Sequence, residues 1–387
     1  MLQDIIIYTP MYVTFFWTVV LLLTRREKNR AKFFLGIFMF SAFLVYLSHA
    51  HFFQKVETGY IYFNSIYNFA SLAVYPLFYW YVRLLTVESD YKTANLVHLI
   101  PGFLAGISAF VVFLMMSAEE QKTYFQYMMD RNSSVENFSL SMQVQKYIFH
   151  ISRIVFLFQV AFYVFRSQNL VRRHNKRVAN FYSNLQSRSI LWVKVLLYSM
   201  VITSAMSIIF NFIGRSVFVD SFRLLTIPSF IFSVLMFIIG MEGLMQNHSV
   251  AEIEIDEKEV PEIDLKNENS VKLKEKLLDL FLKEEVYKIP DLKITDVSEK
   301  LNTNRTYISK LINTEFSCTF SEFVNRYRVV EAKKLLQEES SKNYSLDYIS
   351  EKSGFGSMVN FMRVFRDIEG TTPGKYRETK LNSKKTS

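Results

Sequence analysis

Hydrophobic residues follow two different patterns along the 387-residue chain. Before about residue 248 they form long apolar runs. After it they recur three or four positions apart among charged residues, as in the amphipathic helices of a soluble domain. A membrane-spanning helix needs about 20 mostly apolar residues, because each residue adds about 1.5 Å across a hydrocarbon core about 30 Å thick. Seven stretches meet this requirement: 4–24, 32–52, 60–85, 95–118, 145–166, 190–213 and 222–244. We therefore predict an all-α protein with a seven-helix transmembrane bundle in residues 1–248.

The basic residues between the predicted spans indicate which side of the membrane each segment faces, since cytoplasmic segments are enriched in Lys and Arg. Two clusters follow the first and fifth spans: Arg25, Arg26, Lys28, Arg30 and Lys32, then Arg166, Arg172, Arg173, Lys176, Arg177 and Arg188. We predict an outside N-terminus and a cytoplasmic C-terminal domain, on a multi-pass protein of the cell inner membrane in contact with its lipids. Because the first cluster follows the first apolar run, we expect that run to remain as an anchor.

Polar residues near the outer ends of the spans are candidates for a ligand pocket. They are His150, Arg153, Asn64, Asn68 and Asn211. Ionisable groups inside a membrane span are costly and often functional, which favours an outward-facing pocket for an acidic or polar ligand. The alternative is that these side chains anchor the helix ends at the interface. His49 and His51 are two positions apart and point to different sides of a helix, so we predict no metal site.

The charge changes sharply after the last predicted span. Residues 249–269 carry eight acidic residues and two lysines, which predicts a solvated tether; an alternative is that this tether shields the following domain from a partner. Residues 271–387 carry 22 Lys and Arg against 17 Asp and Glu, a net charge of +5 that suits a nucleic-acid partner. Cys318 is the single cysteine, so an intramolecular disulfide is excluded.

A helix-turn-helix pattern occupies residues 293–313, after an amphipathic helix predicted at 270–286. The first short helix covers 293–301, with Thr295 as its N-cap, and the second begins at residue 305. On the second helix, Tyr307, Ile308, Leu311 and Ile312 are predicted to face the core, and Arg305, Thr306, Ser309 and Lys310 to stay outside. Short polar and basic side chains on this helix are what reading the major groove of DNA requires.

A second helix-turn-helix pattern follows after a linking helix. Thr319 and Glu322 form a capping box for that helix, which is predicted to run to about Glu339. Its residues spaced for burial are Phe323, Tyr327, Val330, Ala332 and Leu335. The linking helix of about 20 residues would be about 30 Å long, close to the turn of about 34 Å of B-DNA, so one chain can place both reading helices in successive major grooves.

In this second pattern, Ser345 is predicted to cap a short helix and Ser357 to cap the reading helix, which ends at Asp367. Gly354 permits the turn between them, and Gly370 suits a helix end with positive φ. The core candidates are Phe361, Val364 and Phe365, and the residues expected to reach outward are Met358, Asn360, Met362, Arg363 and Arg366.

Several ordered blocks in residues 292–377 closely resemble the C-terminal domain of the AraC/XylS family of bacterial transcription regulators. The blocks are Phe323–Val329, Ala332–Leu336, Gly354–Ser357, Phe361–Arg366 and Gly370–Arg377. The resemblance implies an AraC-like double helix-turn-helix domain in residues 270–387. It also implies DNA contacts by these residues: Arg305, Thr306, Ser309, Lys310, Ser357, Met358, Val359, Asn360 and Arg363.

Two departures from the family pattern and one likeness bear on this expectation. Ser317 stands where the family usually has glycine, and Met358 with Val359 replaces more typical polar residues, which puts base specificity of that helix in doubt. The membrane half resembles the minority architecture in which several spans replace the usual soluble sensing domain.

Together these patterns predict a membrane-bound, sequence-specific transcription regulator that couples a signal sensed at the membrane to promoter DNA. Double-stranded DNA and membrane lipids are the expected partners, with RNA polymerase, an unknown ligand and a second copy of the chain as further candidates. We expect no cofactor and no enzyme activity, since no nucleophile–base set, phosphate loop or metal cluster is evident. The alternative is a membrane transporter or receptor with a protein-binding helical tail.

Overall fold

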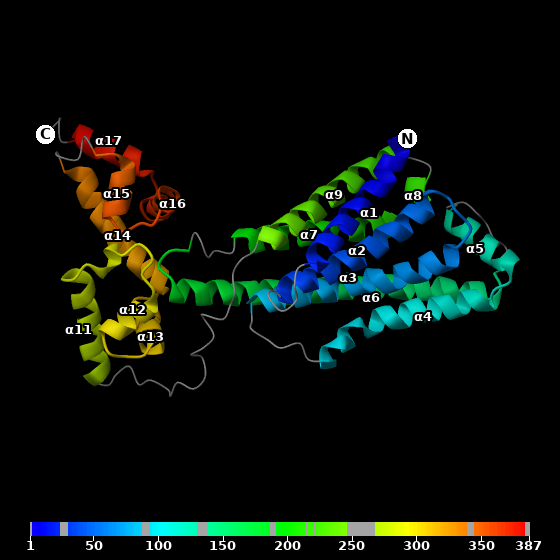
Figure 1. Cartoon of the computed structure of the whole chain (residues 1–387), viewed down its shortest axis with the longest axis horizontal. Helices are drawn as coiled ribbons and strands as arrows, with labels where there is room; N and C mark the ends of the chain where they lie inside the picture. The colour runs from blue at the N-terminus through cyan, green and yellow to red at the C-terminus, as the bar shows by residue number, and fades with distance from the viewer. Residues whose placement is uncertain are drawn as a thin grey trace. The chain divides into compact units, whose positions relative to one another are not determined.

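The computed structural model of the chain describes residues 2–23, 30–86, 93–129, 138–185, 191–213, 216–219, 222–245, 268–338 and 344–383. These residues are helical apart from short connections and one isolated antiparallel bridge, Tyr182–Lys293 (Figure 1). The chain divides into two compact units: unit 1 comprises residues 1–171 and 191–250, and unit 2 comprises residues 172–190 and 251–387. The predicted division differs in one respect, because residues 172–190 were expected to belong with the spans.

Unit 1 contains a helix at each of the seven predicted stretches. Its elements are α1 (Leu2–Leu22), α2 (Arg30–Phe53), α3 (Tyr60–Thr86), η1 (Thr93–Leu99), α4 (Ile100–Met115), α5 (Ala118–Met129), α6 (Leu140–Phe181), α7 (Leu191–Ile213), α8 (Ser216–Val219) and α9 (Phe222–Met245). Helix α2 packs between α1 and α3, α4 packs on α3, and α9 packs on α1. Helix α6 continues to Phe181, so Arg166, Arg172, Arg173, Lys176 and Arg177 lie on a helix and not in the predicted loop.

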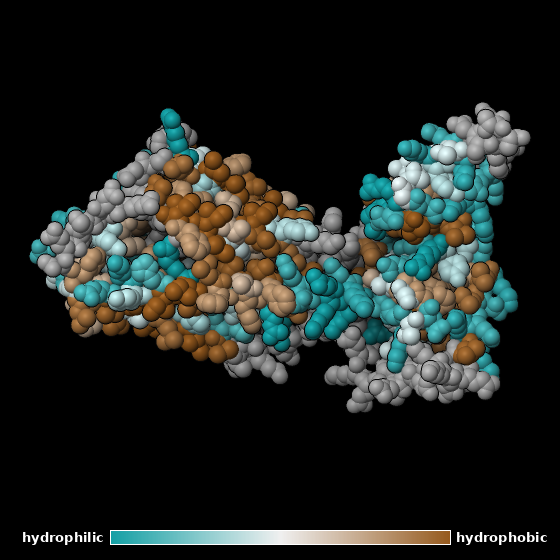
Figure 2. Space-filling model, turned by 180° about the vertical axis from the view of Figure 1, so that it is seen from behind, coloured by the Kyte–Doolittle hydropathy of each residue, from teal (hydrophilic) through white to brown (hydrophobic). Residues whose placement is uncertain are grey.

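Five helices of the described chain are long and apolar enough to cross a membrane: Gln3–Leu22, Arg30–Phe53, Leu96–Met115, Leu140–Phe181 and Arg223–Met245. In α7 the apolar part is the shorter Leu197–Phe210. Hydrophobic side chains cover much of the visible face of unit 1, whereas unit 2 is mainly hydrophilic on that face (Figure 2). The span count of seven stays a prediction, because α3 carries polar residues such as Asn64, Ser65 and Asn68 along its length.

Two glycines of α4 explain how closely this helix approaches α3. A Cβ atom at Gly102 would lie 2.8 Å from the carbonyl oxygen of Phe69, and one at Gly106 would lie 3.2 Å from the carbonyl oxygen of Ser65. Gly102 and Gly106 are four positions apart and share one helix face, as in the small-residue interfaces of membrane helices. A larger residue at either position would push the two backbones apart.

Unit 2 has the helix order predicted for two helix-turn-helix units. Its elements are α11 (Glu268–Leu282), η2 (Val286–Lys288), α12 (Ile294–Lys300), α13 (Arg305–Glu315), α14 (Phe320–Gln337), α15 (Leu346–Lys352), α16 (Met358–Glu369) and α17 (Pro373–Ser383). The last two positions of the predicted linker begin α11; its other positions, and Arg25, Arg26, Lys28 and Arg188, lie outside the described residues.

The helix caps of unit 2 follow the sequence with one exception. The hydroxyls of Thr319, Ser345 and Ser357 each accept a hydrogen bond from the backbone N–H three positions later, as predicted. The prediction that Thr295 caps α12 is wrong. This helix begins at Ile294, and the carboxylate of Asp296 accepts a hydrogen bond from the backbone N–H of Lys293 at 2.8 Å.

Each helix-turn-helix unit has its own buried core. In the first, Phe281 and Phe323 are both buried, and their ring centroids lie 4.9 Å apart. In the second, the core consists of Val329, Ala332, Leu336, Ile349, Phe355, Phe361, Val364 and Phe365. The expected burial of Val330 is wrong, because the core-facing stripe of α14 uses positions 329, 332 and 336, and Val330 lies about 100° away from it around the helix.

Candidate nucleic-acid interface

Helix α13 presents the first predicted reading face. The side chain of Asn304 caps it by accepting a hydrogen bond from the backbone N–H of Thr306 at 2.9 Å. Ile308, Leu311 and Ile312 are buried and fix the rotation of the helix. The predicted readers Arg305, Thr306, Ser309 and Lys310 are therefore held on the outer side, where each is half-buried and not fully exposed.

Helix α16 presents the second predicted reading face, with a different distribution of side chains. Val359 is 67% exposed, and the side chain of Arg363 is 50% exposed. Met358 is half-buried against the second core, so its expected outward position is wrong. Ser357 acts as the N-cap of the helix. The outer surface of α16 is thus apolar at its start and basic one turn later.

Asn360 does not reach outward as expected, since it is only 1% exposed. Its side-chain oxygen accepts a hydrogen bond from Nη2 of Arg363 at 2.9 Å. Its side-chain nitrogen donates to Oδ1 of Asn184 at 3.3 Å. A predicted base reader is therefore engaged by a residue 176 positions earlier in the chain.

Asn184 belongs to a segment of unit 2, residues 178–184, that we call the docking segment. The backbone N–H of Ser183 donates to the carbonyl of Leu292 at 3.1 Å, and Ser321 Oγ donates to the carbonyl of Ser183 at 2.9 Å. Nδ2 of Asn184 donates to Oδ1 of Asp291 at 3.2 Å. The buried residues of the segment are Val178, Phe181, Tyr182, Ser183 and Asn184. The docking segment thus bonds to the loop before α12, to α14 and to α16.

Phe181 also touches the first reading helix. The guanidinium carbon of Arg305 lies 5.3 Å from the centroid of the Phe181 ring, within the range of a cation–π contact. One predicted reader on each helix-turn-helix unit, Arg305 and Asn360, therefore contacts the docking segment.

Arg328 joins the docking segment to the rest of unit 2 and is fully buried. Its Nε donates to the carbonyl of Tyr287 at 2.7 Å, and its Nη2 donates to the carbonyl of Ile289 at 2.6 Å and to Ser183 Oγ at 3.2 Å. Burial lowers the pKa of Arg328 to about 10, and the carboxylate of Asp291 opposes that shift. The guanidinium remains charged at neutral pH and binds several acceptors that face the interior.

Two glycines leave room for these contacts. Gly354 has φ +84°, and a Cβ atom there would lie 2.5 Å from the carbonyl oxygen of Tyr287. A Cβ atom at Gly356 would lie 2.6 Å from Nδ2 of Asn184. The turn of the second unit therefore packs directly against the loop that Arg328 holds and against the docking segment.

Sequence reasoning missed the docking segment because residues 166–188 were interpreted as a basic loop between spans. One local signal was present. Val178, Phe181 and Tyr182 interrupt the basic run, and large apolar residues in a connection predicted to be solvent-exposed indicate that it packs against another part of the protein.

The predicted ligand-pocket residues of unit 1 are not gathered at one described site. His150 is exposed, and the guanidinium of Arg153 lies 5.0 Å from the ring centroid of Phe149. Asn64 and Asn68 are buried in α3, where Asn68 Nδ2 donates to the carbonyl of Asn64 at 3.0 Å. Asn211 lies in α7, and its side chain is outside the described part. Within the described ranges, no three His, Cys, Asp or Glu residues form a group that could hold a metal ion.

Comparison with known proteins places the similarity in the C-terminal domain. A family model described as a helix-turn-helix domain matches residues 297–379. The uncharacterized HTH-type transcriptional regulator YtdP of Bacillus subtilis is 34% identical over 90 residues, which cover 23% of this chain and 11% of YtdP. The probable transcription factor PqrA of Proteus vulgaris is 33% identical over 87 residues, which cover 22% of this chain and 69% of PqrA.

A solved structure of a protein of unknown function from Listeria innocua aligns with 27% of this chain and 94% of its own, at 29% identity and a TM-score of 0.24. The chain spans only small parts of YtdP and of YfiF from Bacillus subtilis, 11% and 29% of their lengths. The matches to YtdP, PqrA and YfiF cover between 22% and 25% of this chain. Through this C-terminal domain, the chain belongs to the AraC-type helix-turn-helix transcriptional regulators.

Proposed function

We propose that the chain is a membrane-bound, sequence-specific transcription regulator in which a signal received by unit 1 controls promoter binding by unit 2. One observation carries this proposal. Residues 172–190 comprise the end of α6 and the connection to α7, two helices of the predicted membrane bundle, yet they belong to unit 2 together with the helix-turn-helix units. The chain therefore connects the two units at three points and not only through the residues after α9.

DNA binding is the part of the proposal that the family membership supports most directly. Helix α13 offers the base- and phosphate-binding groups of Arg305, Thr306, Ser309 and Lys310, and α16 offers Arg363 at its exposed face. Arginine and lysine bind phosphates and guanine edges, whereas Val359 can contact only an apolar group such as the methyl of thymine. We infer that α13 supplies more of the sequence discrimination than α16.

Membrane anchoring rests on the apolar helices of unit 1 and on the basic residues of α6. We infer seven spans, an outside N-terminus, and an inner-membrane location with unit 2 in the cytoplasm. Arg172, Arg173, Lys176 and Arg177 follow the apolar part of α6, and basic residues at this position favour the cytoplasmic side. RNA polymerase and a second copy of the chain are further candidate partners, although one chain alone carries both reading helices.

The docking segment supplies the regulatory step of the proposal. In the docked state, the side-chain N–H of Asn360 donates a hydrogen bond to Asn184, and the guanidinium of Arg305 lies over the ring of Phe181. A group engaged in a hydrogen bond within the protein must give it up before it binds a base. The docked state therefore has the lower affinity for DNA, and a signal that moves α6 or α7 raises the affinity by releasing the segment.

The test is selection of double-stranded DNA from a random library by the full-length chain in lipid nanodiscs. We expect one sequence to be enriched, with binding that weakens as salt increases, because basic residues displace counterions from phosphates. Lys310→Ala and Arg363→Ala should each weaken binding by about 1–3 kcal/mol if they read bases. Lys283→Ala, at an exposed lysine after α11, is the matched control and should change nothing.

The library experiment also decides against the proposal if it fails. The alternative of a transporter or receptor with a protein-binding tail would be supported by either of two results. One is a full-length chain that enriches no sequence, and the other is a chain that binds DNA no better than a neutral control protein does at low salt.

A further inference from the structure

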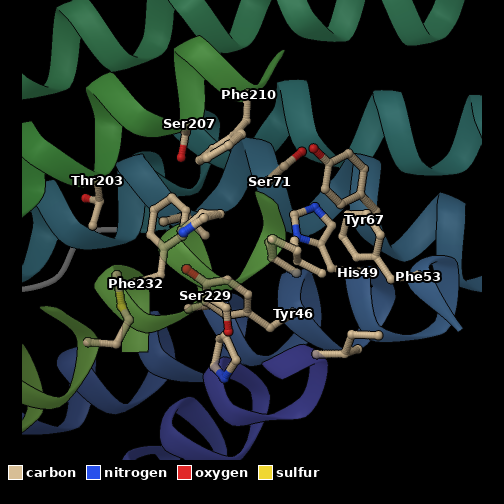
Figure 3. Close-up of a pocket in the computed structure, with 18 of the residues that line it drawn as sticks. Tyr46, His49, Phe53, Tyr67, Ser71, Thr203, Ser207, Phe210, Ser229 and Phe232 are labelled. Atoms are coloured by element: carbon tan, nitrogen blue, oxygen red, sulfur yellow. The ribbon is translucent and has the colours of Figure 1, made fainter. Parts of the chain in front are cut away.

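Unit 1 contains a cavity of about 160 Å³ between its helices (Figure 3). Residues from α1, α2, α3, α6, α7, α8 and α9 line it. The wall includes the rings of Phe53, Phe210 and Phe232 and the hydroxyls of Thr203 and Ser229, as the close-up shows. The predicted pocket residues with described side chains, His150, Arg153, Asn64 and Asn68, are not among its lining residues.

The volume of the cavity limits the size of a ligand. An apolar protein cavity of about 150 Å³ binds benzene. A ligand that fills this volume is therefore about the size of benzene or slightly larger, with about six or seven non-hydrogen atoms. A complete membrane lipid is much larger than this.

The wall also limits the charge of a ligand. No Asp, Glu, Lys or Arg is among the lining residues that the structure describes, and His49 is the only basic side chain among them. Moving an ion from water into such a place is very costly without a partner of opposite charge. Of the acidic or polar ligands expected from the sequence, the cavity disfavours an acidic one and favours an uncharged molecule.

The hydroxyl hydrogen of Ser229 is already used in a hydrogen bond to the backbone of α1. Pro10 has no N–H, so it cannot bond the carbonyl of Ile6 four positions earlier in α1. Ser229 Oγ on α9 donates its hydrogen to that carbonyl. Thr203 Oγ1 likewise donates to the carbonyl of Met200 at 2.9 Å. Each hydroxyl has one hydrogen, so both oxygens face a ligand as acceptors only.

We propose that this cavity binds a small, uncharged aromatic molecule with an O–H or N–H donor. The aromatic rings on the wall complement an aromatic ligand, and the oxygens of Thr203 and Ser229 accept its hydrogen bond. The cavity includes Phe156 of α6 and Phe210 of α7, and residues 172–190 comprise the end of α6 and the connection to α7. Binding of a ligand in the cavity would therefore change the positions of α6 and α7, which lead to the docking segment; this last step rests on the proposed function.

The experiment measures binding of phenol to the full-length chain in nanodiscs by calorimetry and by the shift in Tm. The comparison probes are toluene, which lacks the donor; n-hexanol, which lacks the ring; and benzoate, which is charged at neutral pH. We expect phenol to bind most tightly, toluene and hexanol more weakly, and benzoate not at all. Hexanol binding at least as tightly as phenol would point to lipid-derived alcohols and overturn the aromatic assignment.

Two variants test the site itself. Thr203→Val removes the hydroxyl at nearly constant volume and should weaken phenol about three- to tenfold while leaving toluene unchanged. Thr86→Val, which removes a buried hydroxyl of α3 away from the cavity, is the matched control. Ala42→Phe should fill the cavity and abolish binding of both probes. Equal affinity for phenol and toluene in the unaltered chain, or phenol binding unchanged in Thr203→Val, would overturn the proposal.

Failure of this inference can be told apart from failure of the proposed function. Calorimetry requires no DNA, and DNA binding by the same preparation is measured separately by gel shift. A chain that binds its operator but not phenol refutes the cavity assignment alone. A chain that binds phenol as predicted supports the cavity assignment whatever its affinity for DNA.

Discussion

Asn184→Ala is the substitution that most directly tests the regulatory role of the docking segment. The change removes two side-chain hydrogen bonds, from Asn184 Nδ2 to Asp291 at 3.2 Å and from Asn360 Nδ2 to Asn184 Oδ1 at 3.3 Å. A hydrogen bond within a protein contributes about 0.5–1.5 kcal/mol net, so the docked state should lose about 1–3 kcal/mol. The equilibrium between docked and released segment would then shift about 5- to 150-fold toward release.

The assay is the affinity of the full-length chain for its selected operator, measured by gel shift in nanodiscs. Because the docked state has the lower affinity in our proposal, Asn184→Ala should bind DNA more tightly than the unaltered chain, by at most the same factor. Hydrogen exchange of the backbone amides in the loop before α12, residues 288–293, should become faster in the variant, because the docking segment that packs on this loop is released more often.

The control is Asn180→Ala, in the same segment. The side-chain oxygen of Asn180 makes no hydrogen bond in the described part of the structure, so its removal should change affinity little. Unchanged or weaker DNA binding by Asn184→Ala, together with faster exchange, would refute the reasoning. That result would mean that the docked segment supports DNA binding and does not oppose it.

The remaining predictions concern the same unit and the topology. Gly356→Ala places a methyl group 2.6 Å from the side-chain nitrogen Nδ2 of Asn184. Because this clash disfavours the docked state, gel shifts should show tighter DNA binding in this variant as well. Arg328→Met leaves several buried carbonyls without their donor and should lower the free energy of unfolding of unit 2 by about 3–5 kcal/mol in denaturant titrations, whereas the exposed Arg326→Met should stay within about 0.5 kcal/mol. Reporter fusions after Arg173 should give a cytoplasmic signal and those after Arg131 an exterior one; the opposite pattern would exclude the predicted topology.

The sequence predicted most of the local structure of unit 2, with exceptions such as the N-cap of α12. Caps such as Thr319, Ser345 and Ser357, and the left-handed Gly370, depend on residues within four positions of each other. The buried stripe of Phe361, Val364 and Phe365 follows from helical spacing alone. Even the expected departure at Ser317 is visible, since this residue adopts φ +50°, where glycine would be unstrained.

The parts that the sequence could not predict depend on contacts between distant positions. Asn360 is buried because Asn184 reaches it from 176 positions away, and no periodicity within α16 reveals such a partner. The cavity likewise combines side chains from seven helices, so its lining cannot be read from any one of them. The polar residues expected to share a pocket are not gathered at one described site for a related reason, because depth along a helix does not fix which of its faces points inward.

Helix α14 has a consequence for the architecture of the operator. Its 18 residues hold α13 and α16 at a fixed distance within one chain, and the two reading faces differ, one basic and hydroxyl-rich and the other beginning with Val359. On the proposed mode of binding, the site consists of two unlike subsites and has a direction along the DNA, without the palindrome that a symmetric dimer requires. Inserting one base pair between the subsites turns them about 35° relative to each other, since B-DNA has about 10.5 base pairs per turn, and the rigid linking helix cannot follow. Reversing the whole site would point unit 2 the other way along the promoter.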